Sequence, residues 1–296
     1  MKGACSLFRS AMQTLIAEYF VSSDLPKVFS NTSSAATIGG LLGSSIGGLI
    51  IGFLSATGAM SVVTASFTIA LLALFLLEGT QNDSSQLNEK ASFLSQIIDG
   101  FGYLKKNPFL LGLFFIMFNG QLVFHNTLGF LSVYTDEFLK QTATTYGLLD
   151  ATISCGGAIA GILGTWWWKK SRNLVALNAL LVVVLGLVLM GISSLLITSF
   201  LGVFLIGLGT TWIRVLLQSI QQMATEKKYH GRMASYRMIG NQGAVVISSP
   251  VLGYIAANFG ANFIFISLII PIGICITFAF FQSKQKKLNR IIRNIA

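Results

Sequence analysis

Charged residues are scarce in this chain: Asp, Glu, Lys and Arg together make up 10% of its 296 residues. A soluble globular domain carries about 25% of these residues. The shortage therefore excludes a fold that water surrounds on all sides. Apolar residues take their place, since 53% of the chain is hydrophobic and the mean hydropathy is +0.73. This composition predicts an all-α, polytopic membrane protein.

Cysteine and histidine are also rare, and their positions in the sequence argue against most metal-binding and catalytic sites. The three cysteines, Cys5, Cys155 and Cys275, lie in apolar stretches without the spacing of metal ligands. There are two histidines and no His-Glu-x-x-His sequence, so a membrane-embedded enzyme is a disfavoured alternative. Residues 43–47 have the letters of a hydrolase nucleophile elbow, Gly-x-Ser-x-Gly, but lie inside an apolar helix. We expect no catalytic residue, metal or cofactor.

Apolar runs long enough to cross a bilayer recur along the chain. A membrane helix needs about 20 apolar residues to span roughly 30 Å of hydrocarbon. The run at 4–21 is weaker than the others because it contains Arg9, Gln13 and Glu18. Counting it, we predict nine transmembrane helices, at residues 4–21, 34–54, 60–78, 109–134, 145–168, 174–193, 198–223, 233–257 and 261–282.

The net charge of +10 is unevenly distributed. Basic residues fall on alternate segments between the predicted helices, and the opposite segments carry only Lys140. Positive residues gather on the cytoplasmic side of inserted helices, so we place the carboxyl end in the cytoplasm and expect no nucleic-acid partner. The residues that define this side are Lys27, Lys105, Lys106, Lys169, Lys170, Arg172, Lys227, Lys228, Arg232 and those of the tail over 284–296.

An internal repeat with an offset of 205 positions predicts the architecture. Both copies run from an apolar helix through a short basic loop, a small-residue helix and a tight turn to another apolar helix. The second copy follows three further apolar helices, over 109–193, whereas the first follows almost nothing. We therefore expect a truncated two-half design that begins partway through a membrane crossing. Identical pairs at this offset include Arg9/Arg214, Gln13/Gln218, Ser30/Ser235, Ser44/Ser249, Gly48/Gly253 and Ile50/Ile255.

A long polar segment over 79–108 separates three predicted helices from six. In its second part the apolar residues from Leu94 to Leu104 recur at helical spacing, which suits a helix on the cytoplasmic membrane surface. The predicted organisation is a partial three-helix bundle over 1–78, a linker with this interfacial helix over 79–108, a complete six-helix bundle over 109–283 and a basic cytoplasmic tail over 284–296.

Short motifs on these segments point to a family. Residues 39–48 carry a glycine row, Gly231-Arg232 follows Gln218, and 99–108 read Asp-Gly-Phe-Gly-Tyr-Leu-Lys-Lys-Asn-Pro. Together they resemble the major facilitator superfamily, the twelve-helix transporters built from two six-helix bundles, and in particular its drug and macrolide efflux branch. The glycine row is similar to the family's fifth-helix antiporter motif, with Ser44 where the family usually has proline. The loop over 165–172 resembles a degraded gating motif, with Trp168 at its acidic position.

The resemblance covers helices four to twelve of the family pattern, which implies a partial two-bundle fold. It also implies a secondary active transporter, a proton-coupled antiporter for efflux of a hydrophobic drug-like small molecule, with a role in antibiotic resistance. The implied location is the cell membrane, more specifically a bacterial inner membrane, which the chain crosses several times. The implied partners are protons, a small-molecule substrate and the lipid bilayer. The alternative is a truncated, transport-inactive remnant of such a transporter.

Candidate cavity residues lie on two predicted helices that the family resemblance assigns to the cavity wall. On 109–134, Asn119 and Asn126 are seven apart and share one face, and Gln121 and His125 share a roughly opposite face. Only one pair can face the cavity, and the other must bond to a neighbouring helix; we favour Asn119 and Asn126. His125 is either a core histidine or a proton carrier. Gln218, on 198–223, completes the set.

Charged groups at membrane depth form the candidate coupling or gating set, because such groups usually face a partner or a hydrated cavity. Arg9 and Arg214 are repeat mates, which favours a shared structural or gating role. Arg232 belongs to the motif after Gln218. Asp150 is either a carboxylate held near a helix N-terminus or the proton-coupling residue.

The glycine row over 39–48 has two interpretations. Glycines four apart lie on one helix face and let two helix backbones approach closely in lipid. Tight helix packing is the first interpretation, and the family's role for this helix, sealing the central path against leak, is the second. The residues concerned are Gly39, Gly43, Ser44, Gly47 and Gly48.

Overall fold

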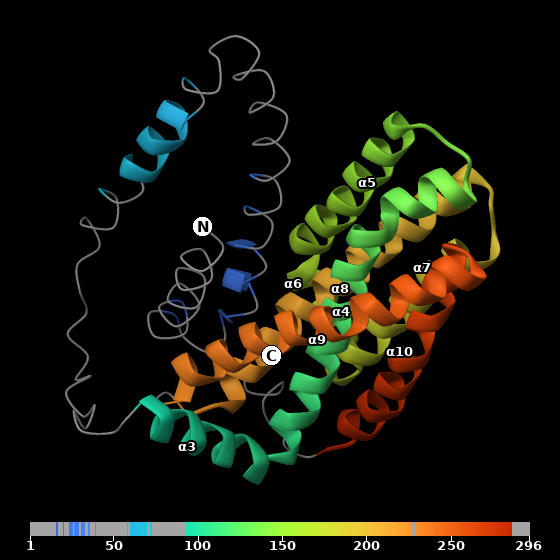
Figure 1. Cartoon of the computed structure of the whole chain (residues 1–296). Coiled ribbons are helices and arrows are strands. Elements are labelled where there is room, and N and C mark those ends of the chain that lie inside the picture. The colour runs from blue at the N-terminus through green and yellow to red at the C-terminus, as the bar shows by residue number, and fades with distance from the viewer. Residues whose placement is uncertain are drawn as a thin grey trace.

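The computed structural model describes residues 93–226 and 229–285, together with 16, 20, 24, 25, 27–29, 31, 32, 35, 39, 58, 60–69 and 72. Every element in these parts is helical, which confirms the predicted all-α class (Figure 1). The elements are α3 (Phe93–Lys106), α4 (Pro108–Val133), η1 (Tyr134–Phe138), α5 (Ala143–Ile162), α6 (Gly164–Ser171), η2 (Arg172–Leu174), α7 (Val175–Ile192), α8 (Leu196–Ala224), α9 (His230–Phe259) and α10 (Asn262–Ser283).

Helix boundaries follow from local backbone chemistry. α4 begins at Pro108, and a proline in the first turn is favourable because its missing N–H would have no partner there. Asn107, just before it, donates from Nδ2 to the carbonyl oxygen of Tyr103 at 2.9 Å, which ties the end of α3 to the start of α4. Between α9 and α10 the chain turns at Gly260, whose φ of 107° is open to glycine and strained for other residues.

Four helical stretches in the described residues are long and apolar enough to cross a membrane. They are Pro108–Phe138, Val175–Ile192, Leu196–Ala224 and Asn262–Ser283. A bent pair, Thr144–Ile162 and Gly164–Ser171, passes the same test when taken together, and its axes differ by 63°. These stretches correspond to the predicted runs at 109–134, 174–193, 198–223, 261–282 and 145–168.

The remaining predicted spans have different outcomes. α9 covers the run at 233–257 and has 30 residues, but it is not among the apolar helices because Arg237, Asn241 and Gln242 lower its hydropathy. The run at 60–78 is described as a shorter helix, Met60–Ile69. The runs at 4–21 and 34–54 lie outside the described residues except for single positions, so the count of nine stays a prediction.

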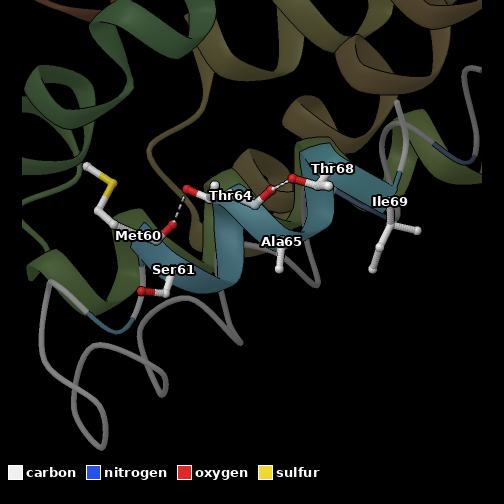
Figure 2. Close-up of a pocket in the computed structure, with 6 residues that line it drawn as sticks. All are labelled: Met60, Ser61, Thr64, Ala65, Thr68 and Ile69. Atoms are coloured by element: carbon white, nitrogen blue, oxygen red, sulfur yellow. Dashed lines mark hydrogen bonds between the residues drawn. The ribbon is translucent and has the colours of Figure 1, made fainter. Parts of the chain in front are cut away.

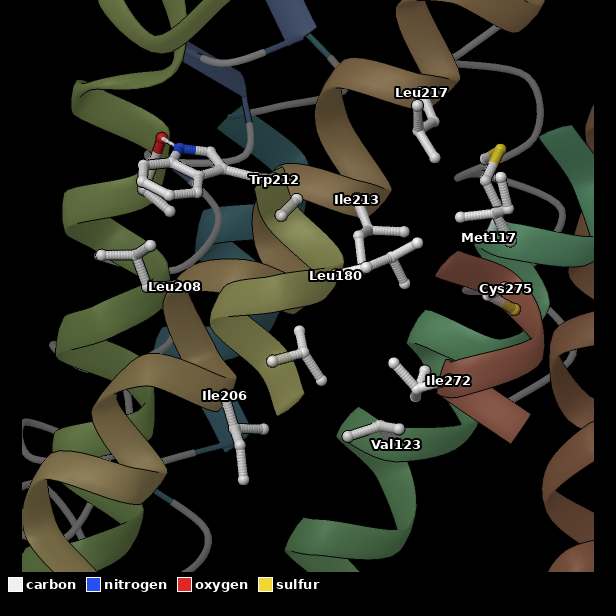
Figure 3. Packing of buried hydrophobic residues seen from close by; sticks show 14 of the residues in the cluster. Met117, Val123, Leu180, Ile206, Leu208, Trp212, Ile213, Leu217, Ile272 and Cys275 are labelled. Carbon is white, nitrogen blue, oxygen red and sulfur yellow. Dashed lines mark hydrogen bonds between the residues drawn. The ribbon is translucent and has the colours of Figure 1, made fainter. Parts of the chain in front are cut away.

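α8 is the central helix of the bundle, with α5, α7 and α4 packed against it. Its buried side chains and those of its neighbours form one continuous apolar core. Burial of such side chains against each other fixes the positions of the helices, since the interior is close-packed. Figure 3 shows part of this core, with Ile206, Leu208, Trp212, Ile213 and Leu217 of α8, Met117 and Val123 of α4, Leu180 of α7, and Ile272 and Cys275 of α10.

Glycines bring α8 into backbone contact with both α5 and α7. A Cβ on Gly207 of α8 would collide with the carbonyl oxygen of Ile153 on α5. On the other side, a Cβ on Gly209 would lie 2.9 Å from the carbonyl oxygen of Ala179 on α7. Only glycine permits this approach, so the α5–α8–α7 arrangement depends on residues that carry no side chain.

Candidate functional site

Asn126 connects α4 to α9 in the second half of both helices. Its side chain is 1% exposed, and its Nδ2 donates to Ser248 Oγ at 2.8 Å and to the carbonyl oxygen of Leu122 at 2.8 Å. Its Oδ1 accepts a hydrogen bond from Ser249 Oγ at 3.2 Å. The contact lies directly before Pro250, a residue that interrupts the backbone hydrogen bonds of α9. Asn126 is thus engaged in a helix–helix contact in this structure.

Asn119 makes a different contact although it shares the α4 face of Asn126. Its buried amide donates from Nδ2 to the carbonyl oxygen of Phe115, at 2.9 Å, within its own helix. Gln121 is also buried, and His125 is half-buried with its ring edge-on to Phe124 at 5.4 Å between centroids. The assignment of these residues to a substrate cavity stays a prediction.

Arg214 joins α8 to α4 through an aromatic ring. Its guanidinium carbon lies 5.9 Å from the centre of the Phe124 ring, within the range of a cation–π contact. Arg214 is half-buried, and Gln218, one turn further along α8, is buried. The structure therefore places Arg214, among the predicted residues, in contact with α4.

Arg232 lies outside that group, at the end of an aromatic stack. Its guanidinium carbon is 5.3 Å from the centre of the Tyr229 ring. Tyr229 in turn stacks on Tyr103 of α3, with ring centres 4.1 Å apart and planes 19° apart. The hydroxyl of Tyr103 accepts a hydrogen bond from the backbone N–H of Glu226 at 3.3 Å. The Gly-Arg motif thus lies where α3 meets the segment between α8 and α9.

Asp150 is half-buried, about two turns into α5.

Five of the other sequence candidates lie outside the described residues: Arg9, Gly43, Ser44, Gly47 and Gly48. Gly39 is described and exposed, and a Cβ built on it would have nothing within 4 Å. In the described part of the chain, glycines permit close packing between α8 and its neighbours α5 and α7.

Arg237 and Gln221 form a buried pair that was not among the sequence candidates. Arg237 of α9 is 4% exposed, and its Nη1 donates to Gln221 Oε1 of α8 at 2.7 Å. A signal was available in the sequence, because polar residues recur at helical spacing towards the end of α8. They are Gln218, Gln221, Gln222 and Thr225, and all four are buried.

Two hollows among the described residues lie away from these polar groups. The larger, of about 620 Å³, has its described lining residues on the helix Met60–Ile69 (Figure 2). Its threonines are already bonded within the helix, Thr64 to Met60 O and Thr68 to Thr64 O, both at 2.9 Å. A surface whose described lining residues belong to one exposed helix and include no charged group is a poor candidate for a ligand site.

The smaller hollow lies between α4–η1 and α9 and measures about 190 Å³. Its wall is apolar except for the carboxylate of Glu137 on η1. Small residues on α9 leave the space open. The lining residues are Phe130, Val133, Glu137, Gly253, Ala256 and Ala257.

A match to a protein-family model identifies the kind of protein that contains this helical bundle. The model described as the Major Facilitator Superfamily matches residues 1–138 and 121–293. The chain belongs to the major facilitator superfamily. A solved structure with the same fold is described as the crystal structure of a major facilitator superfamily transporter, FucP, in the outward conformation. The TM-score is 0.67 at 15% sequence identity, over 93% of this chain and 72% of that chain. No curated protein matches the sequence.

Family membership confirms the coarse predictions of fold and class. The protein is a membrane transporter, with a small-molecule substrate and the lipid bilayer as its partners. The family consists of transporters and not of enzymes. At 15% identity the likeness to FucP concerns the fold alone.

Proposed function

We propose that the chain is a secondary active transporter of the drug and macrolide efflux branch, which exports a hydrophobic drug-like small molecule in exchange for protons. The proposed location is a bacterial inner membrane, where export would confer antibiotic resistance. The proposal includes the division into a partial bundle over 1–78, a linker with an interfacial helix, a six-helix bundle over 109–283 and a cytoplasmic tail. In this scheme two bundles rock around a site between them to give alternating access.

The observation that carries the proposal is the contact between Arg214 and Phe124. A charged side chain within a membrane helix is costly and usually faces a hydrated cavity or a partner. Here the guanidinium faces an aromatic ring at 5.9 Å, and Gln218 lies one turn away on the same helix. Sites for drug-like molecules combine apolar and aromatic walls with a few polar groups, which is the composition of this region.

Asp150 is the proposed proton-coupling group. It is half-buried in α5, the first helix of the bent pair. A carboxylate in such a position can bind a proton in one conformation and release it in another, and so link proton entry to substrate export. Arg9, Arg214 and Arg232 are the proposed gating residues.

Proton-driven uptake tests the proposal directly. The full chain would be reconstituted in vesicles with an imposed pH gradient, and uptake of ethidium and of labelled erythromycin would be followed. We expect Asp150→Asn to abolish gradient-driven uptake because the amide cannot exchange a proton. Asp136→Asn, at an exposed position on η1, is the matched control and should retain uptake.

Retained uptake in Asp150→Asn would remove Asp150 from the coupling mechanism. Expression of the full chain in drug-sensitive cells adds a second readout. If inhibitory concentrations of hydrophobic cations and macrolides stay unchanged although the protein is in the membrane, export by this chain is contradicted. That result would favour the transport-inactive alternative.

A further inference from the structure

The hollow between α4, η1 and α9 combines one carboxylate with an apolar wall. It measures about 190 Å³, and both Phe130 of α4 and Glu137 of η1 line it. On the α9 side, a Cβ built on Gly253 would lie 3.9 Å from the nearest atoms of the Phe130 ring. The half-buried ring therefore lies against α9, where small residues keep the hollow open.

Glu137 extends from a turn with unusual backbone geometry. η1 is a π-helix, in which the N–H of Leu139 donates to the carbonyl oxygen of Tyr134, five residues earlier, at 3.1 Å. Such turns are rare and occur frequently at functional sites. The turn is anchored in the core, because Tyr134 is 0% exposed and its hydroxyl donates to the carbonyl oxygen of Met190 at 3.0 Å. The carboxylate is thus attached to a fixed part of the bundle.

The charge of the wall favours an organic cation. Glu137 forms no ion pair with any residue that the structure describes. An aromatic ring attracts positive charge to its face, so the carboxylate and the Phe130 ring both suit a cation. A metal ion would need several oxygen ligands, and the described residues contain no metal-binding group of three or more His, Cys, Asp or Glu side chains. An organic ammonium ion matches this wall better than a metal ion.

The size of the hollow limits what it can hold. Sites for drug-sized ligands measure about 300–1,000 Å³, whereas a cavity of about 150 Å³ is enough for benzene. At about 190 Å³, the hollow suits a small head group with a few methyl groups rather than a whole drug-sized molecule.

The hollow is expected at the outer surface of the membrane. Glu137 lies about 40 Å along the helix from Pro108, the first residue of α4, which exceeds the roughly 30 Å of the hydrocarbon core. Lys105 and Lys106 precede α4 on the expected cytoplasmic side, so Glu137 lies at the opposite end of the crossing. Water-soluble ammonium compounds and lipid head groups both reach this level.

We propose that Glu137 and Phe130 bind a small organic ammonium group in the hollow between α4, η1 and α9. The ammonium group contacts the carboxylate and the ring, and its alkyl substituents contact the small residues of α9. Its source is a soluble ammonium compound or an ammonium lipid of the outer leaflet. The site goes beyond the proposed function, because it lies about 20 Å along the helix from Phe124 and requires no proton exchange.

Binding of choline and 3,3-dimethylbutan-1-ol tests the site, because the two probes have the same shape and differ in charge. The full chain would be purified in dodecyl maltoside, which has neither charge nor ammonium group, and labelled choline would be measured by equilibrium dialysis. We expect the alcohol to displace choline at least about tenfold less effectively than unlabelled choline does. Glu137→Gln should lower the affinity for choline about tenfold, as for loss of a charged interaction. Asp136→Asn, at the neighbouring exposed carboxylate that does not line the hollow, is the matched control.

Phe130→Leu tests the contribution of the ring. The substitution keeps an apolar side chain and removes the aromatic face. We expect the affinity for choline to fall about two- to fivefold, the range of a cation–π contact at an exposed site. The preference for choline over the alcohol should decrease by the same factor.

Ala257→Leu separates a filled hollow from simple attraction to a surface carboxylate. Ala257 lines the hollow and is exposed, so a larger side chain enters the space without replacing a core residue. We expect choline binding to be lost while the melting temperature stays unchanged. Attraction to the carboxylate alone would survive this substitution.

Added lipid distinguishes the two sources of the ammonium group. If phosphatidylethanolamine weakens choline binding and the same amount of phosphatidylglycerol, which has no ammonium group, does not, a lipid head group occupies the site. Equal binding with both lipids assigns the site to a soluble ammonium compound. Equal affinities for choline and the alcohol, or full choline binding in Glu137→Gln or Ala257→Leu, would overturn the ammonium site. Gradient-driven uptake of ethidium reports separately on the proposed function.

Discussion

The two sides of α8 are held by different kinds of contact. Towards α5 and α7, glycines bring helix backbones together, as at Gly207 against the carbonyl oxygen of Ile153. Towards α4 and α9, long side chains bridge the helices. Arg214 lies over the ring of Phe124 at 5.9 Å, and Gln221 accepts from Arg237 at 2.7 Å. Backbones meet through glycine on the first side, and the polar contacts named on the second are made by side chains.

This difference indicates which parts can move relative to each other. Backbone contacts through glycine leave no side chain that can rotate to accommodate a shift, and packed interiors do not deform continuously. Side-chain contacts can be exchanged for others without overlap of the backbones. We therefore expect α5, α8 and α7 to move as one unit during transport, and the contacts of α4 and α9 with that unit to change. Among the candidates, Arg214 lies at the contact with α4, whereas Asp150 lies on α5, within the unit.

The largest expected effect comes from adding one methyl group to the glycine side. Gly207→Ala places a Cβ against the carbonyl oxygen of Ile153, an atom that cannot rotate away. We expect a loss of about 1–3 kcal/mol of stability, as for overpacking in a dense interior. The measurement is the melting temperature of the purified chain in detergent.

Gly273→Ala on α10 is the control, because a Cβ there has nothing within 4 Å. This substitution should stabilise the helix by roughly 0.5–1 kcal/mol, since alanine loses less backbone entropy than glycine. The two substitutions thus have opposite expected signs. If both raise the melting temperature, the close approach of α5 and α8 is wrong.

A smaller loss is expected when a polar bond on the α5 side is removed. The indole N–H of Trp212 donates to the carbonyl oxygen of Ala160 at 2.9 Å, and its ring stacks on Trp167 with centres 4.0 Å apart. Trp212→Phe removes the donor and should cost about 1 kcal/mol. Trp166→Phe, at an exposed ring in α6, should change the melting temperature little. Equal effects of the two substitutions would contradict the bond.

The smallest effect is expected for the polar contact between α4 and α9. Double-mutant cycles measure it best, because the coupling energy between membrane helices averages about 0.6 kcal/mol. We expect Asn126→Ala and Ser249→Ala to be coupled by roughly that amount. The same cycle with Asn119→Ala should show no coupling, since Asn119 bonds within its own helix at 2.9 Å. If both asparagines showed coupling of the same size to Ser249, the different bonding of Asn126 and Asn119 would be contradicted.

Hydropathy predicted the long apolar helices well because it depends on local composition. α4, α7, α8 and α10 cover the runs predicted at 109–134, 174–193, 198–223 and 261–282. The bend of 63° after Ile162 was not predicted. It brings Trp167 of α6 onto Trp212 of α8, a contact between residues far apart in the chain. Local patterns carry no information about such a partner.

The buried pair of Arg237 and Gln221 likewise could not be predicted from local sequence patterns. Basic residues crowd the sequence between α8 and α9, so Arg237 resembles one more residue of the positive cytoplasmic side. Its burial depends on the neighbouring helices, and its bond depends on Gln221, 16 positions away. The candidates found by sequence, Arg214 and Arg232, both contact aromatic rings, and neither ring was foreseen.

The sequence by itself determined that this chain is a bundle of apolar helices in the major facilitator superfamily, because composition and short motifs act locally along the chain. Only the tertiary structure decided the partner of each polar side chain. Asn119 and Asn126 are the same residue type on one face of α4, yet the first bonds to its own helix and the second to Ser248 and Ser249. Helical periodicity sets the direction in which a side chain points. The approach of α9 to α4 near Pro250 decides whether that side chain meets a serine hydroxyl.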